Sequence, residues 1–182
     1  ARMTPEERAR VGRALRSVDL LVVLSHNQVS VMCESFGLHP EKVVAIPFGV
    51  CTRFFTRREG SEYDIDVLAV GQDSARDYRT LFEAVAGQPW RTHLLCSYSN
   101  IVGLAVPDNV VVETAADHVR YRALLARARV VVTPTTAPTY PSGQTVVLEA
   151  MSMGAVNVVT NSPAMREYVP PHAGVLVAPG DA

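Results

Sequence analysis

Short apolar runs alternate with amphipathic segments along most of the chain. Mostly apolar or β-branched runs occur at 20–24, 43–46, 66–70, 92–96, 110–112, 130–133, 156–160 and 174–177. Such runs are typical of strands buried on both faces of a parallel sheet. Helical spacing predicts helices at about 4–16, 25–37, 78–86, 117–128, from 143 onward and at 164–169. We therefore expect an α/β fold, a Rossmann-like parallel sheet with helices on both faces.

Local end signals support the first two helices. Thr4 precedes Pro5, and Glu7 follows three positions after Thr4, which predicts a capping box with proline at the first helical position. Ser25 is the expected N-cap of the second helix. Gly37 is its expected end, as a residue in the left-handed conformation.

The segment from Cys51 to Asp64 loses periodicity and becomes polar, as an interdomain connector does. We place a boundary there, which divides the chain into residues 1–60 and 61–182. The chain starts within a helix and stops just after a predicted strand. We therefore expect it to be a fragment.

Composition and charge narrow the class of protein. A length of 182 residues suffices for one sizeable core, or for one domain and part of another. Hydrophobic residues at 48% and charged residues at 19% are ordinary globular values. A net charge of −1 gives no electrostatic footprint for nucleic acid. The one dense basic cluster, Arg53, Arg57 and Arg58, is interpreted as a solvated connector.

The cysteines and the apolar runs bear on the compartment. Cys33, Cys51 and Cys96 are widely spaced and odd in number, which signals neither a disulfide framework nor a zinc site. No apolar run approaches the roughly twenty residues of a membrane span, and residues 1–16 form a charged helix pattern. We expect a cytoplasmic protein without a transmembrane segment.

The stretch 140–154 turns a strand into a helix through a loop suited to close backbone approach. Free N–H groups and the helix dipole favour an anion such as phosphate at a helix start. Backbone amides from Ser142, Gly143, Gln144 and Thr145 would supply this site, with Gly143 admitting the ligand. The alternative is an N-cap serine followed by a turn glycine, and both interpretations can hold together.

Two charged side chains stand near that loop. Glu149 could accept hydrogen bonds from the vicinal hydroxyls of a ribose or sugar, or could merely favour the helix N-terminal turn or solvate one face. Arg76 follows the strand at 66–70 and could reach bound phosphate. Its alternative is a surface charge paired with Asp73 or Asp77, which from the residues alone is the favoured interpretation.

Three loops should converge at the carboxyl edge of the sheet, where parallel α/β proteins bind ligands. They are 71–77, 134–143 and 161–163. The five histidines have no metal-ligand spacing, so no metal site is expected. Neither the G-x-G-x-x-G dinucleotide fingerprint nor the P-loop motif is present.

The chain resembles retaining glycosyltransferases of family 4, which have two Rossmann-like domains in the GT-B arrangement. The resemblance rests on 23–25 with 40–50 and Phe54, on Val70-Gly71 with Arg76, on 124–134, on Leu148-Glu149-Ala150-Met151 with Gly154, and on 162–169. It implies that residues 1–60 are the tail of the N-terminal acceptor domain and linker. Residues 61–182 would be the C-terminal donor domain, without its last crossover helix.

The resemblance implies transfer of a sugar from a nucleotide-diphosphate sugar, with retention of configuration and without metal or cofactor. Gly71, Arg76 and the amides of 142–145 would bind the diphosphate, Glu149 would bind the ribose, and Arg76 and Glu149 would carry catalysis. The acceptor is unknown, and the resemblance is compatible with association of the full protein with a membrane surface. We expect the chain alone to transfer sugar poorly or not at all.

Two positions depart from the family pattern. Pro141 stands where a second glutamate usually contacts the donor sugar, and Gln72 stands where an arginine usually follows the loop glycine. These departures indicate either a subgroup with altered sugar contacts or lost activity. Two alternatives therefore stay open: a noncatalytic nucleotide-binding or interaction module, and a GT-B-like nucleotide-sugar epimerase.

Overall fold

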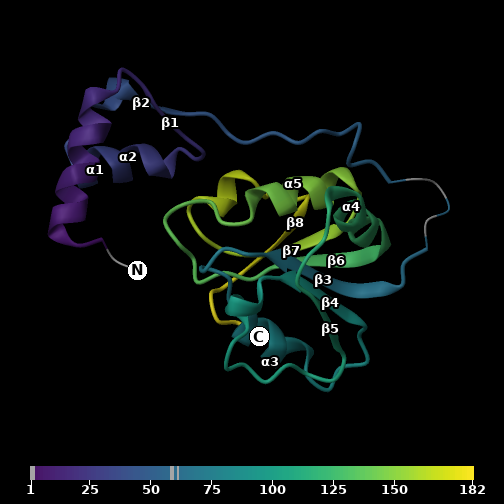
Figure 1. The fold of residues 1–182 in the computed structure, drawn as a ribbon. Coiled ribbons are helices and arrows are strands. Elements are labelled where there is room, and N and C mark those ends of the chain that lie inside the picture. Colours follow the sequence, from purple (N-terminus) through teal and green to yellow (C-terminus); the bar gives the residue numbers. More distant parts are fainter. Residues whose placement is uncertain (1–2, 58–59, 61) are drawn as a thin grey trace.

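The computed structural model describes residues 3–57, 60 and 62–182 and contains two separate parallel sheets (Figure 1). The smaller pairs β1 (Leu21–Val23) with β2 (Val43–Ala45). The larger has the order β5-β4-β3-β6-β7-β8, with every neighbouring pair parallel. Its strands are β3 (Ile65–Gly71), β4 (Thr92–Cys96), β5 (Val110–Glu113), β6 (Ala128–Thr133), β7 (Val156–Thr160) and β8 (Gly174–Val177).

The helices lie between the strands much as the periodicity predicts. The α-helices are α1 (Pro5–Ser17), α2 (Asn27–Phe36), α3 (Tyr78–Val85), α4 (His118–Arg127) and α5 (Gln144–Ser152), and the 3₁₀ helices are η1 (Pro40–Lys42), η2 (Tyr98–Asn100) and η3 (Met165–Glu167). The helix predicted at 164–169 is thus only the short 3₁₀ turn η3. The limits predicted for β4, β7 and β8 are confirmed.

The start of α1 follows its local sequence signal. The Thr4 hydroxyl accepts from the Glu7 N–H at 3.2 Å, and the Glu7 carboxylate accepts from the Thr4 N–H at 2.8 Å. The capping box is confirmed. Gly37 ends α2 at φ 64° and ψ 41°, as expected for a left-handed terminal glycine.

The predicted Ser25 cap of α2 is wrong. The Ser25 hydroxyl donates to the side chains of Asn27 (2.7 Å) and Gln28 (3.2 Å), and the helix begins after His26 without a side-chain cap from its own segment. The N–H groups of His26 and Asn27 instead donate to the Glu167 carboxylate, 141 and 140 positions away. A distant acceptor has therefore replaced the local one.

The strand at 20–24 was expected to be buried on both faces, and this prediction is wrong. Val22 is 48% exposed and its neighbour Val44 is 40% exposed, whereas Val23 and Val43 pack against α1 and α2. With helices packed against one face only, the alternate residues of this two-stranded sheet stay uncovered.

The six-stranded sheet is covered on both faces. In Figure 1, α4 and α5 lie above it and α3 below it. Leu124, Leu125 and Val146 of the upper helices pack on Leu68 and Val131. Below the sheet, the core consists of residues of α3, β3, β4 and their neighbours, including Tyr78, Leu81, Phe82, Val67, Ala69 and Leu94.

The connector 51–64 is partly packed. Phe55 is 8% exposed, meets Phe54 edge to face at 5.0 Å, and its carbonyl accepts from the Ser152 hydroxyl at 2.5 Å. The expectation of a polar connector is therefore wrong for this end. Arg58 of the predicted basic cluster, together with residues 59 and 61 at the predicted boundary, lies outside the described residues.

Two further features concern the surface. No helix among the described residues is long and apolar enough to cross a membrane.

A groove of about 600 Å³ runs along the α3 side of the sheet, lined by Leu81, Val130, Val158 and the last residues through Ala182. Neither Arg76 nor Glu149 lines this groove, although Asp77 and Pro134 of the predicted loops do.

Candidate functional site

The three predicted loops meet at the carboxyl edge of the sheet because β3, β6 and β7 are neighbours. Arg76 and Thr135 form an isolated antiparallel bridge between the first two loops. The Thr136 N–H donates to the Ala75 carbonyl at 2.9 Å, and the Thr135 N–H donates to the Thr160 hydroxyl at the end of β7, also at 2.9 Å. The convergence predicted from strand order is confirmed.

Helix α5 begins at this edge, and no side chain caps its first backbone N–H groups. Its N-cap is Gly143, at φ 90° and ψ 9°, with no side-chain hydrogen bond to the helix start. The alternative that Ser142 is the N-cap is therefore wrong. The amides of the first turn, from Gln144 and Thr145 onward, keep the geometry that favours an anion.

Arg76 lies between the two loop glycines. A Cβ atom at Gly71 would stand 2.1 Å from the Arg76 Nε, and one at Gly143 would stand 2.6 Å from its Nη1. The guanidinium thus occupies the space that any larger side chain at either position would fill. Gly71 and Gly143 are required here by close approach.

Arg76 is not a surface charge. The residue is 8% exposed, and within the described part of the chain it makes no ion pair, while its buried Nε and Nη1 have no hydrogen-bond partner. Burial lowers the pKa of its guanidinium from the ordinary value. The interpretation of an exposed pair with Asp73 or Asp77 is wrong, and a buried cation is left for an anion to neutralise.

Asp73 fixes the loop that leads into α5, a role the sequence analysis missed. Its carboxylate accepts from the hydroxyls of Ser142 (2.7 Å) and Tyr140 (3.0 Å) and from the Ala75 N–H (3.1 Å). Burial acts to raise the pKa of Asp73, but these bonds and the nearby Arg76 charge lower it. The carboxylate therefore stays ionised and holds both residues that flank Pro141.

Glu149 lies in the second turn of α5, half-buried beside α4. Its Oε2 accepts a hydrogen bond of 2.5 Å from the hydroxyl of Tyr121, a residue the sequence analysis did not select. The alternative of a first-turn carboxylate is wrong, because the first turn of α5 has no acidic residue. Burial raises the pKa of Glu149, and the Tyr121 bond acts against that rise.

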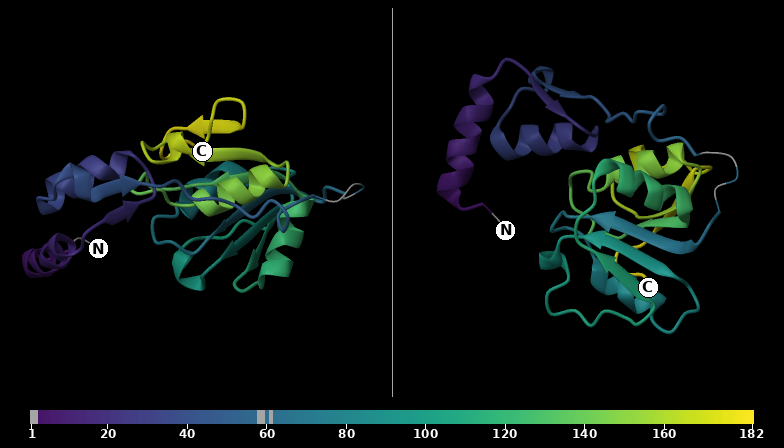
Figure 2. Two further views of the ribbon diagram at one scale, coloured as in Figure 1. Left: turned by 90° about the horizontal axis from the view of Figure 1, so that it is seen from above. Right: turned by 45° about the vertical axis from the view of Figure 1, so that its right-hand side comes forward.

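The N-terminal part lies beside the same edge of the larger sheet (Figure 2), and a second set of contacts joins the two. In addition to the backbone N–H groups at the start of α2, the His26 Nδ1 lies 2.8 Å from a Glu167 oxygen. The side-chain amide of Asn27 donates to the Thr139 carbonyl at 2.8 Å. The Tyr168 hydroxyl donates to the Leu24 carbonyl at 2.5 Å. The loop before α5 is therefore held from both parts of the chain.

Solved structures share this architecture. The chain aligns with a glycosyltransferase from Rickettsia africae at a TM-score of 0.72 and 14% identity, over 100% of this chain and 56% of that one. HepE of Anabaena, in complex with UDP and glucose, aligns at 0.79 and 18%, over 98% and 55%. Sucrose-phosphate synthase from Thermosynechococcus elongatus aligns at 0.78 and 17%, over 98% and 50%.

These alignments show a common fold, the α/β architecture of GT-B glycosyltransferase domains. The chain spans about half the length of the structures it matches. None of the curated protein sequences matches it. The model of one sequence family, described as glycosyl transferases group 1, matches residues 56–182. The match takes in the loop edge and α5, and by it the chain belongs to the glycosyl transferases group 1 family.

Proposed function

We propose that this chain carries the donor site of a retaining glycosyltransferase of family 4, which transfers a sugar from a nucleotide diphosphate to an acceptor still to be identified. One observation carries the proposal: the buried Arg76 lies between Gly71 and Gly143, beside the uncapped start of α5, without an anionic partner among the described residues. A phosphate suits a cation and a row of amides together, and a diphosphate offers a phosphate to each.

Each part of the donor has its own residues in this proposal. The amides of Ser142, Gly143, Gln144 and Thr145, with Gly71 for clearance, bind the diphosphate. Glu149 accepts hydrogen bonds from the ribose hydroxyls. As the bond to the sugar breaks, negative charge grows on the departing diphosphate. Arg76 and the helix start stabilise that charge, so the proposed reaction assigns this work to the chain rather than to a metal or cofactor.

The domain assignment belongs to the same proposal. Residues 61–182 form the donor-binding domain, and residues 1–60 form the end of the acceptor domain with the linker. The contacts of Glu167 and Thr139 with α2 join the two parts at the edge where the donor would bind. The free thiols Cys33, Cys51 and Cys96 suit a reducing cytoplasm.

The test is a thermal-shift panel of UDP, GDP, ADP and their glucose conjugates. UDP comes first because HepE was crystallised with UDP and with UDP-glucose. A ligand that binds only the folded state raises the melting temperature. At a free ligand concentration of one hundred times Kd, it adds about 2.7 kcal/mol to the free energy of unfolding. We expect one nucleotide to do so, with the shift abolished in Glu149→Ala and reduced in Arg76→Ala. The matched control is Arg79→Ala, an exposed arginine on α3.

Saturable binding that is unchanged by both substitutions would overturn the assignment of the site.

A second candidate function, a noncatalytic nucleotide-binding module, is favoured by one observation. Pro141 is buried between the Asp73-bound Tyr140 and Ser142 and offers no carboxylate to a donor sugar. A full-length protein that binds the donor but neither hydrolyses nor transfers its sugar would establish this second candidate.

A further inference from the structure

The hydrogen bond between Tyr121 and Glu149 joins two helices on the same face of the sheet. Tyr121 lies in α4 and Glu149 in α5, 28 positions apart, and the Oη to Oε2 distance is 2.5 Å. A hydroxyl that donates to an ionised oxygen forms a charge-assisted bond, which is stronger than one between neutral groups. The contact therefore fixes the orientation of the Glu149 carboxylate.

The Tyr121 ring is itself held in place. It packs on the core above the sheet and meets the Phe55 ring edge to face, with centroids 6.0 Å apart. Phe55 is 8% exposed, and its carbonyl accepts from Ser152 of α5. A ring packed this way leaves its hydroxyl little freedom, so the bond to Glu149 does not require a mobile side chain to be ordered.

The bond uses one of the two carboxylate oxygens. Within the described residues, Oε2 accepts from Tyr121 and no protein donor is found for Oε1. Carboxylate oxygens accept hydrogen bonds and cannot donate while ionised. The free oxygen is the acceptor that a diol needs. Burial raises the pKa of Glu149 and the Tyr121 bond opposes that rise, so the phenol also favours the ionised form.

The electrostatic surroundings of Tyr121 include both Glu149 and Arg76. Burial and the bond to Glu149 raise the pKa of Tyr121, while the Arg76 charge acts in the opposite direction.

We propose that Tyr121 is a positioning residue for ribose recognition: it holds one oxygen of Glu149 and thereby directs the other toward the hydroxyls of a nucleoside diphosphate. This inference rests on the proposed function, since it gives Glu149 its ligand. Tyr121 itself need not touch the nucleotide.

The experiment compares UDP with 2′,3′-dideoxyuridine 5′-diphosphate on the wild-type chain and on Tyr121→Phe, with Kd measured by calorimetry. The substitution removes only the hydroxyl and keeps the ring that packs on Phe55. We expect the wild type to prefer UDP about tenfold or more. In Tyr121→Phe, UDP should bind roughly five- to tenfold more weakly, while the dideoxy compound binds as before.

The control is Tyr98→Phe, which removes a hydroxyl from a tyrosine that is 70% exposed and should alter neither Kd. Melting curves of both variants separate loss of fold from loss of contact. A uniform loss of affinity for both nucleotides in Tyr121→Phe, or an unchanged preference for UDP, would overturn the role of Tyr121. A wild type that binds UDP without preferring its hydroxyls would overturn the ribose role of Glu149 and with it this inference. If UDP, GDP and ADP all fail to bind the wild type, the proposed function itself is wrong.

Discussion

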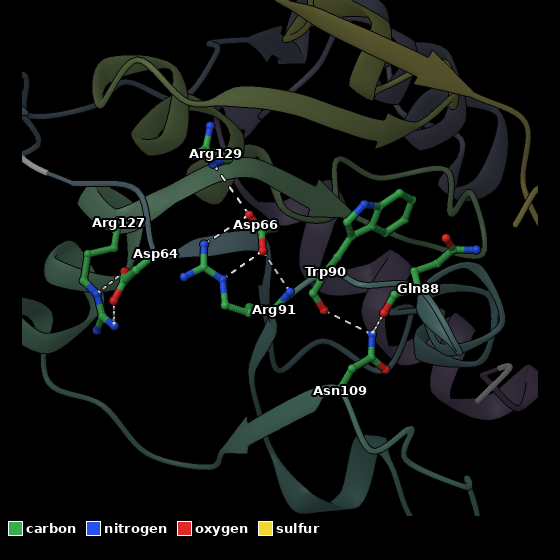
Figure 3. Close-up of polar contacts among 8 residues, drawn as sticks. All are labelled: Asp64, Asp66, Gln88, Trp90, Arg91, Asn109, Arg127 and Arg129. Atoms are coloured by element: carbon green, nitrogen blue, oxygen red, sulfur yellow. Dashed lines mark hydrogen bonds and ion pairs between the residues drawn. The ribbon is translucent and has the colours of Figure 1, made fainter.

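The amino and carboxyl ends of the same parallel strands differ in how their charges are paired. At the amino ends, Asp64 binds the Arg127 guanidinium at 2.5 and 2.6 Å (Figure 3). Asp66 accepts from the Arg91 backbone N–H at 2.9 Å and from its Nε at 3.0 Å, and it lies 3.5 Å from Arg129 (Figure 3). Each of these carboxylates has a cationic partner.

At the carboxyl ends, Arg76 is buried and has no such partner among the described residues. Asp73, three positions before it, accepts instead from the hydroxyls of Ser142 and Tyr140. Exposed ion pairs such as Arg91–Asp66 contribute little to stability, so breaking one changes the free energy of unfolding little. A buried unpaired cation costs stability, and this cost is what supports the proposed ligand site at Arg76.

The largest expected effect comes from closing the space around Arg76. Gly143→Ala would place a Cβ 2.5 Å from the Thr133 Cγ2 and 2.6 Å from the Arg76 Nη1, at a φ of 90°. We expect a loss of roughly 2–4 kcal/mol in the free energy of unfolding, and no detectable UDP binding. Urea denaturation and calorimetry measure the two effects.

Gly87→Ala is the matched control for that change. Gly87 also has a positive φ, of 72°, but no atom lies within 4 Å of its added Cβ. It should lose only about 1 kcal/mol from backbone strain and keep UDP binding. Equal effects at both glycines would show that strain, and not the space around Arg76, limits position 143.

The next effect separates stability from binding. Arg76→Met removes a buried charge without a protein partner, so we expect the free energy of unfolding of the unliganded chain to rise by about 1–2 kcal/mol while UDP affinity falls roughly tenfold. Arg127→Met removes a paired charge at the opposite end of the sheet and should lose about 0.5 kcal/mol without altering affinity. Chemical denaturation and calorimetry on both variants test the contrast. A destabilised Arg76→Met would assign Arg76 a structural role.

A smaller effect concerns Glu167, a charge at the carboxyl edge that already has partners within the protein. Its carboxylate accepts from the backbone N–H groups of His26 and Asn27 at the start of α2. Glu167→Gln weakens the charge-assisted part of this cap, so both amides should exchange hydrogen roughly tenfold faster. Glu41→Gln, at a side chain that is 89% exposed, is the control. Unchanged exchange in Glu167→Gln would show that the two parts of the chain associate without this cap.

The smallest effect is the pH dependence of stability, which should have opposite signs for one carboxylate at each end of the strands. The Arg91 hydrogen bonds lower the pKa of Asp66 to about 2, so its contribution is present above its unfolded pKa of about 3.9 and is lost as pH falls toward 2. Burial raises the pKa of Glu149, so its contribution is present below about pH 4.3 and is lost as pH rises through the folded pKa.

Urea denaturation from pH 3 to pH 7 measures both signs. Asp66→Asn should flatten the loss of stability on the acid side, and Glu149→Gln should flatten the decline on the other side. If both variants change the curve in the same direction, the two carboxylates do not differ in the way the structure indicates.

The fold and part of the site could be predicted because their signals are local. The Thr4 capping box spans three residues, and the limits of β4, β7 and β8 follow from apolar runs that end at turn residues. Strand order also brought the loop of Arg76 to the start of α5. Each of these depends on backbone sterics and periodicity, which neighbouring residues determine.

The partners of polar groups could not be predicted in the same way. The sequence favoured Arg76 as a surface charge and Ser25 as a cap, yet the structure buries the first and caps α2 with Glu167, 141 positions from His26. Hydrogen bonds to distant side chains have no period in the sequence. They arise only when packed elements desolvate a group and a distant acceptor or donor lies within reach.

The sequence by itself determined the parallel α/β order and the helix start after the glycine-containing loop, and it singled out Arg76 and Glu149 as the charged candidates. Only the tertiary structure decided that Arg76 lies between two glycines without a protein anion, and that Tyr121 holds one oxygen of Glu149. The physical reason is that periodicity and capping act over a few residues. The protonation state and orientation of a side chain depend instead on burial and on partners brought together by the whole fold.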